Sequence, residues 1–318
     1  MSKLAGSSRL PDFYGIGAPR CGTTTIFQLL QRQPSAFVPV KEPRYWCDDL
    51  DSGSAADSLF FTRTFDEYVA LYAAARPDDV VGDMSTWYLM SRTAVPRIVR
   101  ATPGARFIVG VRNPVDLMQS LHAWRVAGLS EDIVDFRAAL AAEDERLCGQ
   151  RITRNVRNRS GLFYRRVASL GEQLQRLAAH VPMDQIHVYV YDDFREDPLG
   201  TLNSLLEFLC LQPLAPEDDI PIVNLRPSVS RLSLRTSLMS PPTVIWARRF
   251  VPAPIRRTAR HLLDAVTLGR ETRASAPKIG LSGTERRDLL ESFRADIELV
   301  SEFTRRDMWA LWSRPDPS

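Results

Sequence analysis

Short runs of apolar residues recur along the first two thirds of the chain, and each is followed by polar or turn-forming residues. The runs are rich in Val, Ile, Phe and Tyr, the residues that buried parallel strands favour. We therefore predict strands immediately before Gly17 and over residues 36–40, 80–82, 107–111 and 186–191.

Apolar residues spaced three or four positions apart follow most of these runs and predict helices. They lie over residues 65–72, 115–121, 170–177 and 202–209, and a further helix is expected to begin at Thr23. Alternating strands and helices predict an α/β fold with a central, mostly parallel sheet flanked by helices. Ligands of such sheets bind at the carboxyl ends of the strands. Four charged residues fall at that edge: Arg20, Glu42, Asp83 and Arg112.

The last third of the chain departs from this pattern. Residues 211–242 are rich in proline and loop-like, and the next segment is basic and partly amphipathic. Helical spacing returns over residues 281–303, where Ser282 and Glu285 are placed for a capping box. We predict a single domain over residues 1–318. Its parts are an α/β core over 12–210, an irregular substrate-side or lid segment over 211–280, and a C-terminal helix and tail over 281–318.

The composition is that of an ordinary globular protein, with 44% apolar and 25% charged residues among 318. The four cysteines form no Cys-x-x-Cys pair and have no histidine partners at metal-ligand spacing. This argues against zinc and indicates a reducing compartment. Residues 1–11 do not resemble a signal peptide, and no stretch of about 18 apolar residues exists to span a bilayer. We therefore expect a cytoplasmic protein.

The net charge of +3 is too small to indicate a nucleic-acid-binding protein, but the arginines are unevenly distributed. Residues 146–171 contain seven arginines and residues 244–260 contain five, and neither stretch contains an acidic residue. Such runs are either solvated faces or the lining of a groove for anions.

Residues 12–30 nearly match the phosphate-binding P-loop. In that motif the glycines let backbone N–H groups surround a phosphate, and a lysine after the last glycine contacts the terminal phosphates. Here Ala-Pro-Arg-Cys separates Gly17 from Gly22, but Thr23 stands where the lysine belongs, and Arg20 is the only full charge. The loop therefore suits an anion with less terminal charge than a triphosphate, such as a mixed phosphate–sulfate anhydride.

A helix beginning at Thr23 adds the unpaired N–H groups and the positive dipole of its first turn to this loop. For this segment alone, a plain strand–turn–helix corner without a ligand remains the alternative.

A second candidate anion site follows the strand predicted over residues 107–111. Pro114 suits the first position of a helix and Asn113 its cap. Arg112 then lies at the strand end and Ser120 about two turns into the helix. An arginine fork and a serine hydroxyl suit a phosphate monoester, although taken alone Arg112 is equally a cap for a carbonyl group.

Together these segments resemble the sulfotransferases that use 3'-phosphoadenosine 5'-phosphosulfate (PAPS), in particular the carbohydrate-type and bacterial branch. The likeness lies in residues 19–25 (Pro-Arg-Cys-Gly-Thr-Thr-Thr), 41–46 (Lys-Glu-Pro-Arg-Tyr-Trp) and 112–114 (Arg-Asn-Pro) with Ser120, and in residues 82–89, 163–174 and 186–194. It covers residues 12–210 well and the last third loosely. The resemblance implies a P-loop-like, three-layer fold that binds a nucleotide.

The resemblance also implies roles for individual residues. Arg20 stands where the family usually has lysine, and it would hold the 5'-phosphate and bridging oxygen together with Cys21, Gly22, Thr23, Thr24 and Thr25. Arg112 and Ser120 match the pair that binds the 3'-phosphate. Glu42 matches the general base, and Arg20 and Lys41 would assist the departing phosphate.

Such an enzyme transfers a sulfuryl group by in-line displacement to a hydroxyl of a carbohydrate or another small metabolite. Because this group carries less charge than a phosphoryl group, no metal is expected. Two positions depart from the family: Arg44 replaces a frequent histidine, and Cys47 replaces an aspartate of some members.

Other interpretations stay open for the candidate bases. Glu42 is alternatively a surface carboxylate paired with Lys41 or Arg44. His122 is a rival base, although a histidine on an apolar helix is more often a packing residue. Asp83 is a third candidate, and it would equally serve to hold Arg20 or Lys41 in place.

Two other classes of function also remain. A P-loop kinase or NTPase would use Asp83 to hold magnesium, but it lacks its lysine. A non-catalytic anion-binding protein, or one with weak peripheral membrane contact through Trp246 and Phe250, leaves both anion loops unexplained. The sequence does not identify the acceptor among sugars, lipids and secondary metabolites, and it does not determine the oligomeric state.

Overall fold

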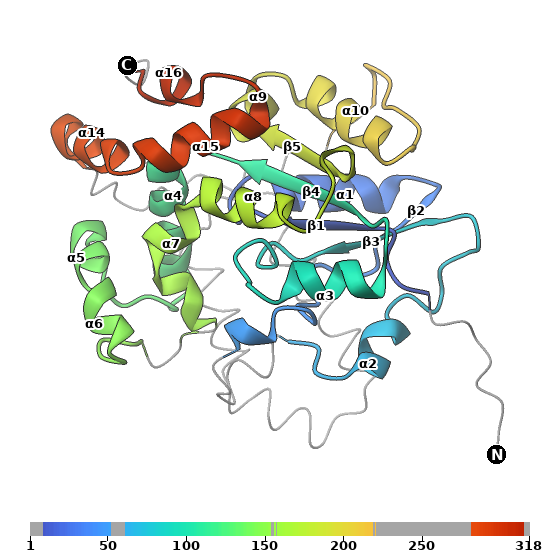
Figure 1. Ribbon diagram of the computed structural model, residues 1–318, viewed down its shortest axis with the longest axis horizontal. Coiled ribbons are helices and arrows are strands. Elements are labelled where there is room, and N and C mark those ends of the chain that lie inside the picture. Colours follow the sequence, from blue (N-terminus) through green and yellow to red (C-terminus); the bar gives the residue numbers. More distant parts are fainter. Residues whose placement is uncertain are drawn as a thin grey trace.

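The fold is built around a five-stranded, all-parallel sheet (Figure 1). The structure is a computed structural model that describes residues 9–51, 61–153, 156, 158–218, 220 and 281–314. The basic run over 244–260 and most of the loop expected over 211–242 lie outside these residues. The strands are β1 (Phe13–Gly17), β2 (Ala36–Phe37), β3 (Val80–Met84), β4 (Arg106–Val111) and β5 (Ile186–Val190).

The strand order is β2-β3-β1-β4-β5, so β1 is central, with β3 and β4 as neighbours. All five predicted strands are present. The second is shorter than the prediction over residues 36–40, since Pro39 cannot donate a ladder hydrogen bond and the strand ends at Phe37. Beyond it, Lys41 forms an isolated bridge to Met84 at the end of β3.

Helices connect and cover the strands. They are α1 (Thr23–Arg32), α2 (Phe65–Ala70), α3 (Ala94–Ala101), α4 (Pro114–Ala127), α5 (Phe136–Ala141), α6 (Glu143–Leu147), α7 (Tyr164–Ala168), α8 (Leu170–Ala178), α9 (Tyr191–Glu196), α10 (Pro198–Phe208), α14 (Gly283–Glu291), α15 (Arg294–Thr304) and α16 (Met308–Trp312). In the described ranges, 3-10 turns add η1 (Asp48–Leu50), η3 (Arg159–Leu162) and η4 (Met183–Gln185).

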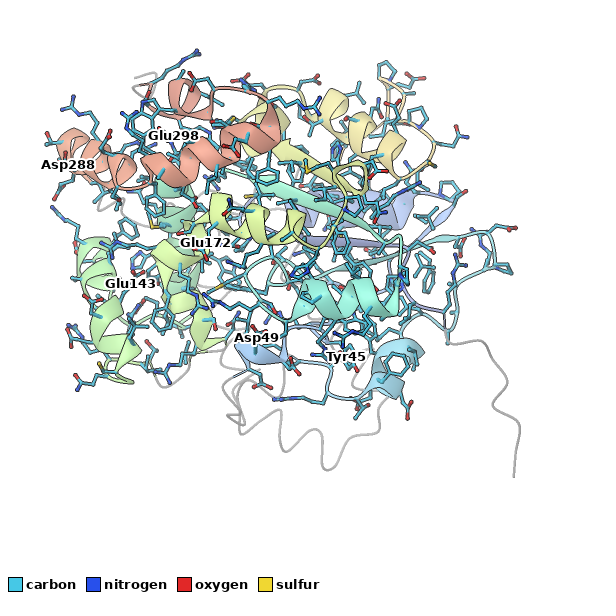
Figure 2. All side chains as sticks on the ribbon, in the orientation of Figure 1. Tyr45, Asp49, Glu143, Glu172, Asp288 and Glu298 are labelled. Atoms are coloured by element: carbon cyan, nitrogen blue, oxygen red, sulfur yellow. The ribbon has the colours of Figure 1, made fainter. Side chains whose placement is uncertain are left out.

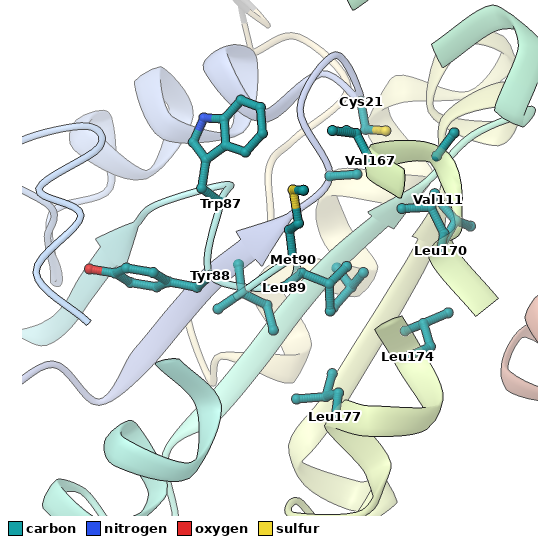
Figure 3. Packing of buried hydrophobic residues seen from close by; sticks show 14 of the residues in the cluster. Cys21, Trp87, Tyr88, Leu89, Met90, Val111, Val167, Leu170, Leu174 and Leu177 are labelled. Carbon is teal, nitrogen blue, oxygen red and sulfur yellow. The ribbon is translucent and has the colours of Figure 1, made fainter. Parts of the chain in front are cut away.

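The strands alternate their side chains between two apolar layers, as parallel strands covered on both faces do. Phe13 and Ile108 face the layer formed with α1, α9 and α10. Tyr14 and Phe107 face the larger layer formed with α3, α4, α7, α8 and α15. Figure 3 shows part of the larger layer, in which leucines of α8 point toward the sheet. The three-layer α/β architecture predicted from the sequence is confirmed.

The C-terminal segment forms two helices where one was predicted over residues 281–303. The predicted capping box is present at the start of α14, where Ser282 and Glu285 exchange hydrogen bonds. The helix stops before Phe293, whose φ of −100° and ψ of 6° are not helical and whose side chain is buried. α15 then packs along α8, where the Asp296 carboxylate accepts hydrogen bonds from the Gly171 and Glu172 amides.

Candidate active site

The loop between β1 and α1 depends on a glycine at its last position. Gly22 has a φ of 80°, in the left-handed region that favours glycine. A Cβ at this position would also lie 2.5 Å from the ring of Phe194. α1 begins at Thr23, and no side chain caps its N-terminus. The N–H groups of its first turn and the positive end of its dipole face the loop. Thr23 and Thr25 are buried and Thr24 is partly exposed.

A tyrosine of β5, which is separated from β1 by β4, holds this loop in place. The Tyr189 hydroxyl donates a hydrogen bond of 2.7 Å to the Cys21 carbonyl. It crosses β4 at Gly110, where an added Cβ would lie 2.4 Å from the Tyr189 hydroxyl. The Cys21 side chain is buried, and burial raises the pKa of its thiol to about 12. Cys21 therefore contributes backbone geometry and a neutral side chain to the loop.

The two candidate anion segments meet through Arg20. Its Nε donates a hydrogen bond to the Ser120 hydroxyl at 3.0 Å, and its carbonyl accepts one from Nη1 of Arg112 at 2.8 Å. Burial, with a further contribution from the charge of Arg112, lowers the pKa of Arg20 to about 10. Arg20 thus stays protonated at neutral pH, and two cations and a hydroxyl lie together at the carboxyl ends of β1 and β4.

Arg112 is held in place by an aromatic ring. Its guanidinium lies 4.5 Å from the centroid of Tyr191, at the end of β5, in a cation–π contact. Within the described part of the chain, Arg112 forms no ion pair with a carboxylate. Its charge is therefore available to an anion.

Asn113 caps α4 as predicted. Its Oδ1 accepts hydrogen bonds from the Val115 and Asp116 amides, and Pro114 occupies the first helical position. Its Nδ2 donates to the carbonyl of Trp312 in α16. The Trp312 indole donates to Asp192, beside Tyr191. α16 thus braces the connection that carries Arg112 and Ser120.

Glu42 lies in a short turn after β2 with a φ of 61°. Its carboxylate accepts hydrogen bonds from the Thr86 hydroxyl (2.7 Å), Arg44 Nε (3.1 Å) and Lys41 Nζ (3.4 Å). Burial would raise the pKa of Glu42, but the charges of Lys41 and Arg44 and these hydrogen bonds outweigh it and hold the pKa below its usual 4.5. Glu42 is therefore a carboxylate at neutral pH, paired with Lys41 and Arg44 at the site edge of the sheet.

Asp83 is completely buried at the end of β3. Its carboxylate accepts hydrogen bonds from three hydroxyls, those of Ser85, Tyr68 and Tyr88. Burial raises its pKa to about 7, although these hydrogen bonds act in the opposite direction. Among the described residues the hydrogen-bond partners of Asp83 are these three hydroxyls, and no ion pair joins it to Arg20 or Lys41, the two cations that it was expected to hold in its alternative role.

His122 lies among apolar groups of α4. Its Nε2 is 2.8 Å from the carbonyl oxygen of Ile133, and its ring packs against Phe136 and Tyr164. Burial lowers its pKa below 6.5. These surroundings are typical of a packing residue, which was the alternative to a catalytic role for His122.

The arginine run over residues 146–171 is partly structural. Arg146 is fully buried and pairs with Glu131 at 2.8 Å, and Arg165 pairs with Glu143 at 3.1 Å. Arg154 and Arg157 lie outside the described residues.

The described helices include none with both the length and the apolar character needed to cross a bilayer. The same residues bring no three His, Cys, Asp or Glu side chains together as a metal-binding group.

Comparison with solved structures identifies the architecture. A sulfotransferase from Alicyclobacillus acidocaldarius superposes with a TM-score of 0.66 and 22% identity, over 96% of this chain and 100% of that chain. This chain has the sulfotransferase fold. No family model and no curated protein sequence matches it.

Two further sulfotransferase domains align less well, each with 16% identity and a TM-score of 0.42. One, from the curacin biosynthetic pathway, covers 66% of this chain and 77% of its own. The other, from the Synechococcus PCC 7002 olefin synthase, covers 92% of this chain and 98% of its own. Both scores are too low to carry an argument about this chain.

Within the sulfotransferase fold, three side chains at the site were not predicted from the sequence. They are Tyr189, which holds the Cys21 carbonyl, Tyr191, which stacks on Arg112, and Trp312, which braces Asn113. The only local signal was the aromatic run at the end of the predicted strand over 186–191.

Proposed function

We propose that this protein is a sulfotransferase that moves the sulfuryl group of PAPS to a hydroxyl of a carbohydrate or another small metabolite. The observation that carries the proposal is the convergence of Arg20, Arg112 and Ser120 beside the glycine loop and the N-terminus of α1. Such a site offers two guanidinium groups, a hydroxyl and backbone N–H groups, which suit a nucleotide with phosphates at two separate positions.

PAPS supplies an activated sulfuryl group attached to its 5'-phosphate. The acceptor oxygen forms a bond to sulfur while the bond from sulfur to the 5'-phosphate oxygen breaks, and adenosine 3',5'-bisphosphate (PAP) leaves. In the proposal, Glu42 takes the proton of the acceptor hydroxyl. Arg20, Lys41 and the first turn of α1, with Cys21 to Thr25, stabilise the charge that develops on the departing phosphate. Arg112 and Ser120 bind the 3'-phosphate.

The charge state of Glu42 supports this role. Lys41 and Arg44 hold its pKa below 4.5, so at neutral pH it is ready to accept a proton. The rival bases have poorer surroundings. Asp83 gives both oxygens to hydroxyls, and His122 lies against a backbone carbonyl between two aromatic rings.

The surroundings of Asp83 also remove support from the kinase alternative. Its magnesium ligand would be Asp83, whose carboxylate is completely buried and bound by Ser85, Tyr68 and Tyr88. We therefore propose transfer without a metal. We also propose a cytoplasmic setting, since all four cysteines are free, and one domain over residues 1–318 without a nucleic-acid partner.

The proposal is tested by incubating the protein with sulfur-labelled PAPS and a panel of hydroxyl acceptors in EDTA. We expect a labelled sulfate ester and retention of the protein on immobilised PAP, with elution by PAP but not by magnesium–ATP. Glu42→Gln is expected to bind PAP normally and to lose turnover. Glu172→Gln, an isosteric change at an exposed ion pair with Arg176, serves as the control. Retention on PAP that magnesium–ATP reverses, or full turnover by Glu42→Gln, would contradict the assignment.

A further inference from the structure

The turn that carries Glu42 contains two residues in an unfavourable backbone conformation. Glu42 has a φ of 61° and Arg44 a φ of 56°, both in the left-handed region that residues with a Cβ rarely occupy. Such conformations persist only where surrounding contacts impose them. The contacts of this turn therefore determine where the Glu42 carboxylate lies.

Three consecutive residues of the turn donate hydrogen bonds to three hydroxyl groups. The Arg44 amide donates to Ser85 Oγ at 3.1 Å, and the Tyr45 amide donates to the Tyr88 hydroxyl at 3.1 Å. The Trp46 indole donates to the Tyr68 hydroxyl at 2.9 Å. Figure 2 labels Tyr45, which lies between α2 and α3. Its ring stacks on Tyr68, with centroids 4.7 Å apart.

All three hydroxyls converge on one carboxylate. Ser85 lies 2.8 Å from Oδ1 of Asp83, and Tyr68 and Tyr88 lie 2.8 Å and 2.9 Å from Oδ2. The amides and the indole of the turn can only donate, so each hydroxyl accepts from the turn and must direct its own proton elsewhere. In its ionised form, above its raised pKa, Asp83 is the acceptor for all three protons and thereby sets the direction of every hydrogen bond in the group.

The group is connected to the proposed base through Arg44. Ser85 holds the Arg44 amide, and the Arg44 guanidinium holds Oε2 of Glu42 at 3.1 Å. Thr86, the next residue after Ser85, holds Oε1 of Glu42 at 2.7 Å. Both oxygens of the Glu42 carboxylate are thus held by the segment that follows Asp83. Oε2 is held through Arg44, whose amide bonds to Ser85, and Oε1 is held by Thr86 itself.

We propose that Asp83 is a positioning residue for Glu42, acting through the hydroxyls of Ser85, Tyr68 and Tyr88 on the turn over residues 44–46. This inference rests on the proposed function, because it assigns Glu42 the role of base. Asp83 itself is fully buried and does not contact the reacting groups.

Asp83→Asn tests the role of the carboxylate. An amide group replaces one acceptor oxygen by a donor, so at least one hydroxyl that already accepts from the turn loses the acceptor for its proton. Tyr88→Phe and Tyr68→Phe remove one connection each and keep the rings. Tyr72→Phe is the matched control. Tyr72 is buried in the same aromatic cluster, 5.2 Å from Tyr68, and its hydroxyl has no hydrogen-bond partner among the described residues.

The first measurement does not depend on catalysis. Amide hydrogen exchange of the full chain reports the opening of the turn through the amides of Arg44 and Tyr45. We expect exchange of both amides about tenfold faster in Asp83→Asn, exchange of the Tyr45 amide about tenfold faster in Tyr88→Phe, and no change in Tyr72→Phe. Unchanged exchange at these amides in Asp83→Asn and Tyr88→Phe would overturn the proposal. If Asp83→Asn fails to fold, the exchange of the Tyr45 amide in Tyr88→Phe decides.

The second measurement separates positioning from general damage to the fold. In Asp83→Asn, kcat is expected to fall about a hundredfold, whereas the KM for PAPS and the affinity for PAP change less than about twofold. An equal loss in kcat and PAP affinity would show a merely structural role. If the wild-type protein transferred no sulfuryl group, the proposed function would be refuted. The hydrogen-exchange result would then still test whether Asp83 positions the turn.

Discussion

The Nε atom of Arg20 lies 3.0 Å from the Ser120 hydroxyl, although the two residues are 100 positions apart. Arg20 belongs to the loop after β1 and Ser120 to the second turn of α4, after β4. Because β1 and β4 are adjacent parallel strands, their carboxyl ends bring these segments together. The two candidate anion-binding segments are thus in direct contact through Arg20, Ser120 and Arg112.

Ser120→Ala should weaken PAP binding about five- to tenfold. The substitution removes a hydroxyl that binds a cation, which corresponds to about 1–1.4 kcal/mol. Isothermal titration with PAP measures the change. Ser130→Ala is the control, because Ser130 is also buried and its hydroxyl bonds only the Arg125 carbonyl among the described groups. An unchanged affinity in Ser120→Ala would place the 3'-phosphate elsewhere.

Gly22→Ala should destabilise the fold more than Gly104→Ala. Both glycines have a positive φ, 80° and 85°, so both substitutions carry a backbone cost of about 1 kcal/mol. Only at Gly22 does the new Cβ meet another group, the Phe194 ring, whereas nothing lies within 4 Å of a Cβ at Gly104. Urea unfolding of both variants isolates the steric contribution, which we expect to be about 1–2 kcal/mol. Equal losses would mean that Phe194 moves aside freely.

The contribution of Asp83 to the free energy of unfolding should decrease as the pH rises from about 4 to 7. Its pKa is about 7 in the folded protein against an ordinary value of 3.8, so in this interval the folded state binds a proton that the unfolded state has released. Its favourable contribution is complete below pH 3.8 and is lost as the pH rises through about 7, by at most about 1.4 kcal/mol per pH unit.

Among the groups that face Asp83, Glu42 has a pKa below 4.5, and Tyr14, Tyr68, Tyr72, Tyr88 and Cys47 have raised ones, so Asp83 is the group of this set that titrates around pH 7. Urea unfolding at pH 5 to 8 should therefore show that wild-type protein loses stability relative to Asp83→Asn as the pH rises, since all other titrating groups are common to both proteins. Parallel pH dependences of the two proteins would contradict the raised pKa.

Two substitutions of Asn113 separate its two roles. Asn113→Asp keeps an oxygen that caps α4 but loses the Nδ2 donor to the Trp312 carbonyl, and should cost about 1–2 kcal/mol. Asn113→Ala loses the cap as well, with an additional cost of about 1 kcal/mol. Thermal unfolding measures the relative stabilities of the wild type and the two variants. If Asn113→Asp were as stable as the wild type, the contact with α16 would contribute no free energy.

Features with a local sequence signal were predictable. The strands, the glycine of the first loop, the Asn113 cap with Pro114, and the Ser282 capping box each follow from neighbouring residues, and the structure contains all of them. The role of Asp83 had no such signal. The sequence places it at a strand end, but its partner Tyr68 lies on α2, and only the tertiary structure brings that hydroxyl to the end of β3.

Contacts between distant residues account for what the sequence did not reveal. Tyr189 reaches the loop after β1 across 168 positions because β5 lies beside β4 and Gly110 leaves room. The left-handed conformation of Glu42 was equally hidden, since nothing local favours it in a residue with a Cβ. Both are imposed by tertiary packing.

The hydrogen bond between Asn113 and Trp312 also constrains the order of events during translation. A ribosome releases the chain from its N-terminus, so β1, β3 and β4 become available for pairing long before α16 exists. The brace on α4 comes from Trp312, 199 positions further along the chain than the residue it holds, and it forms only after Trp312 is synthesised. The central strands can therefore pair before α16 is available to brace the connection that carries Arg112 and Ser120.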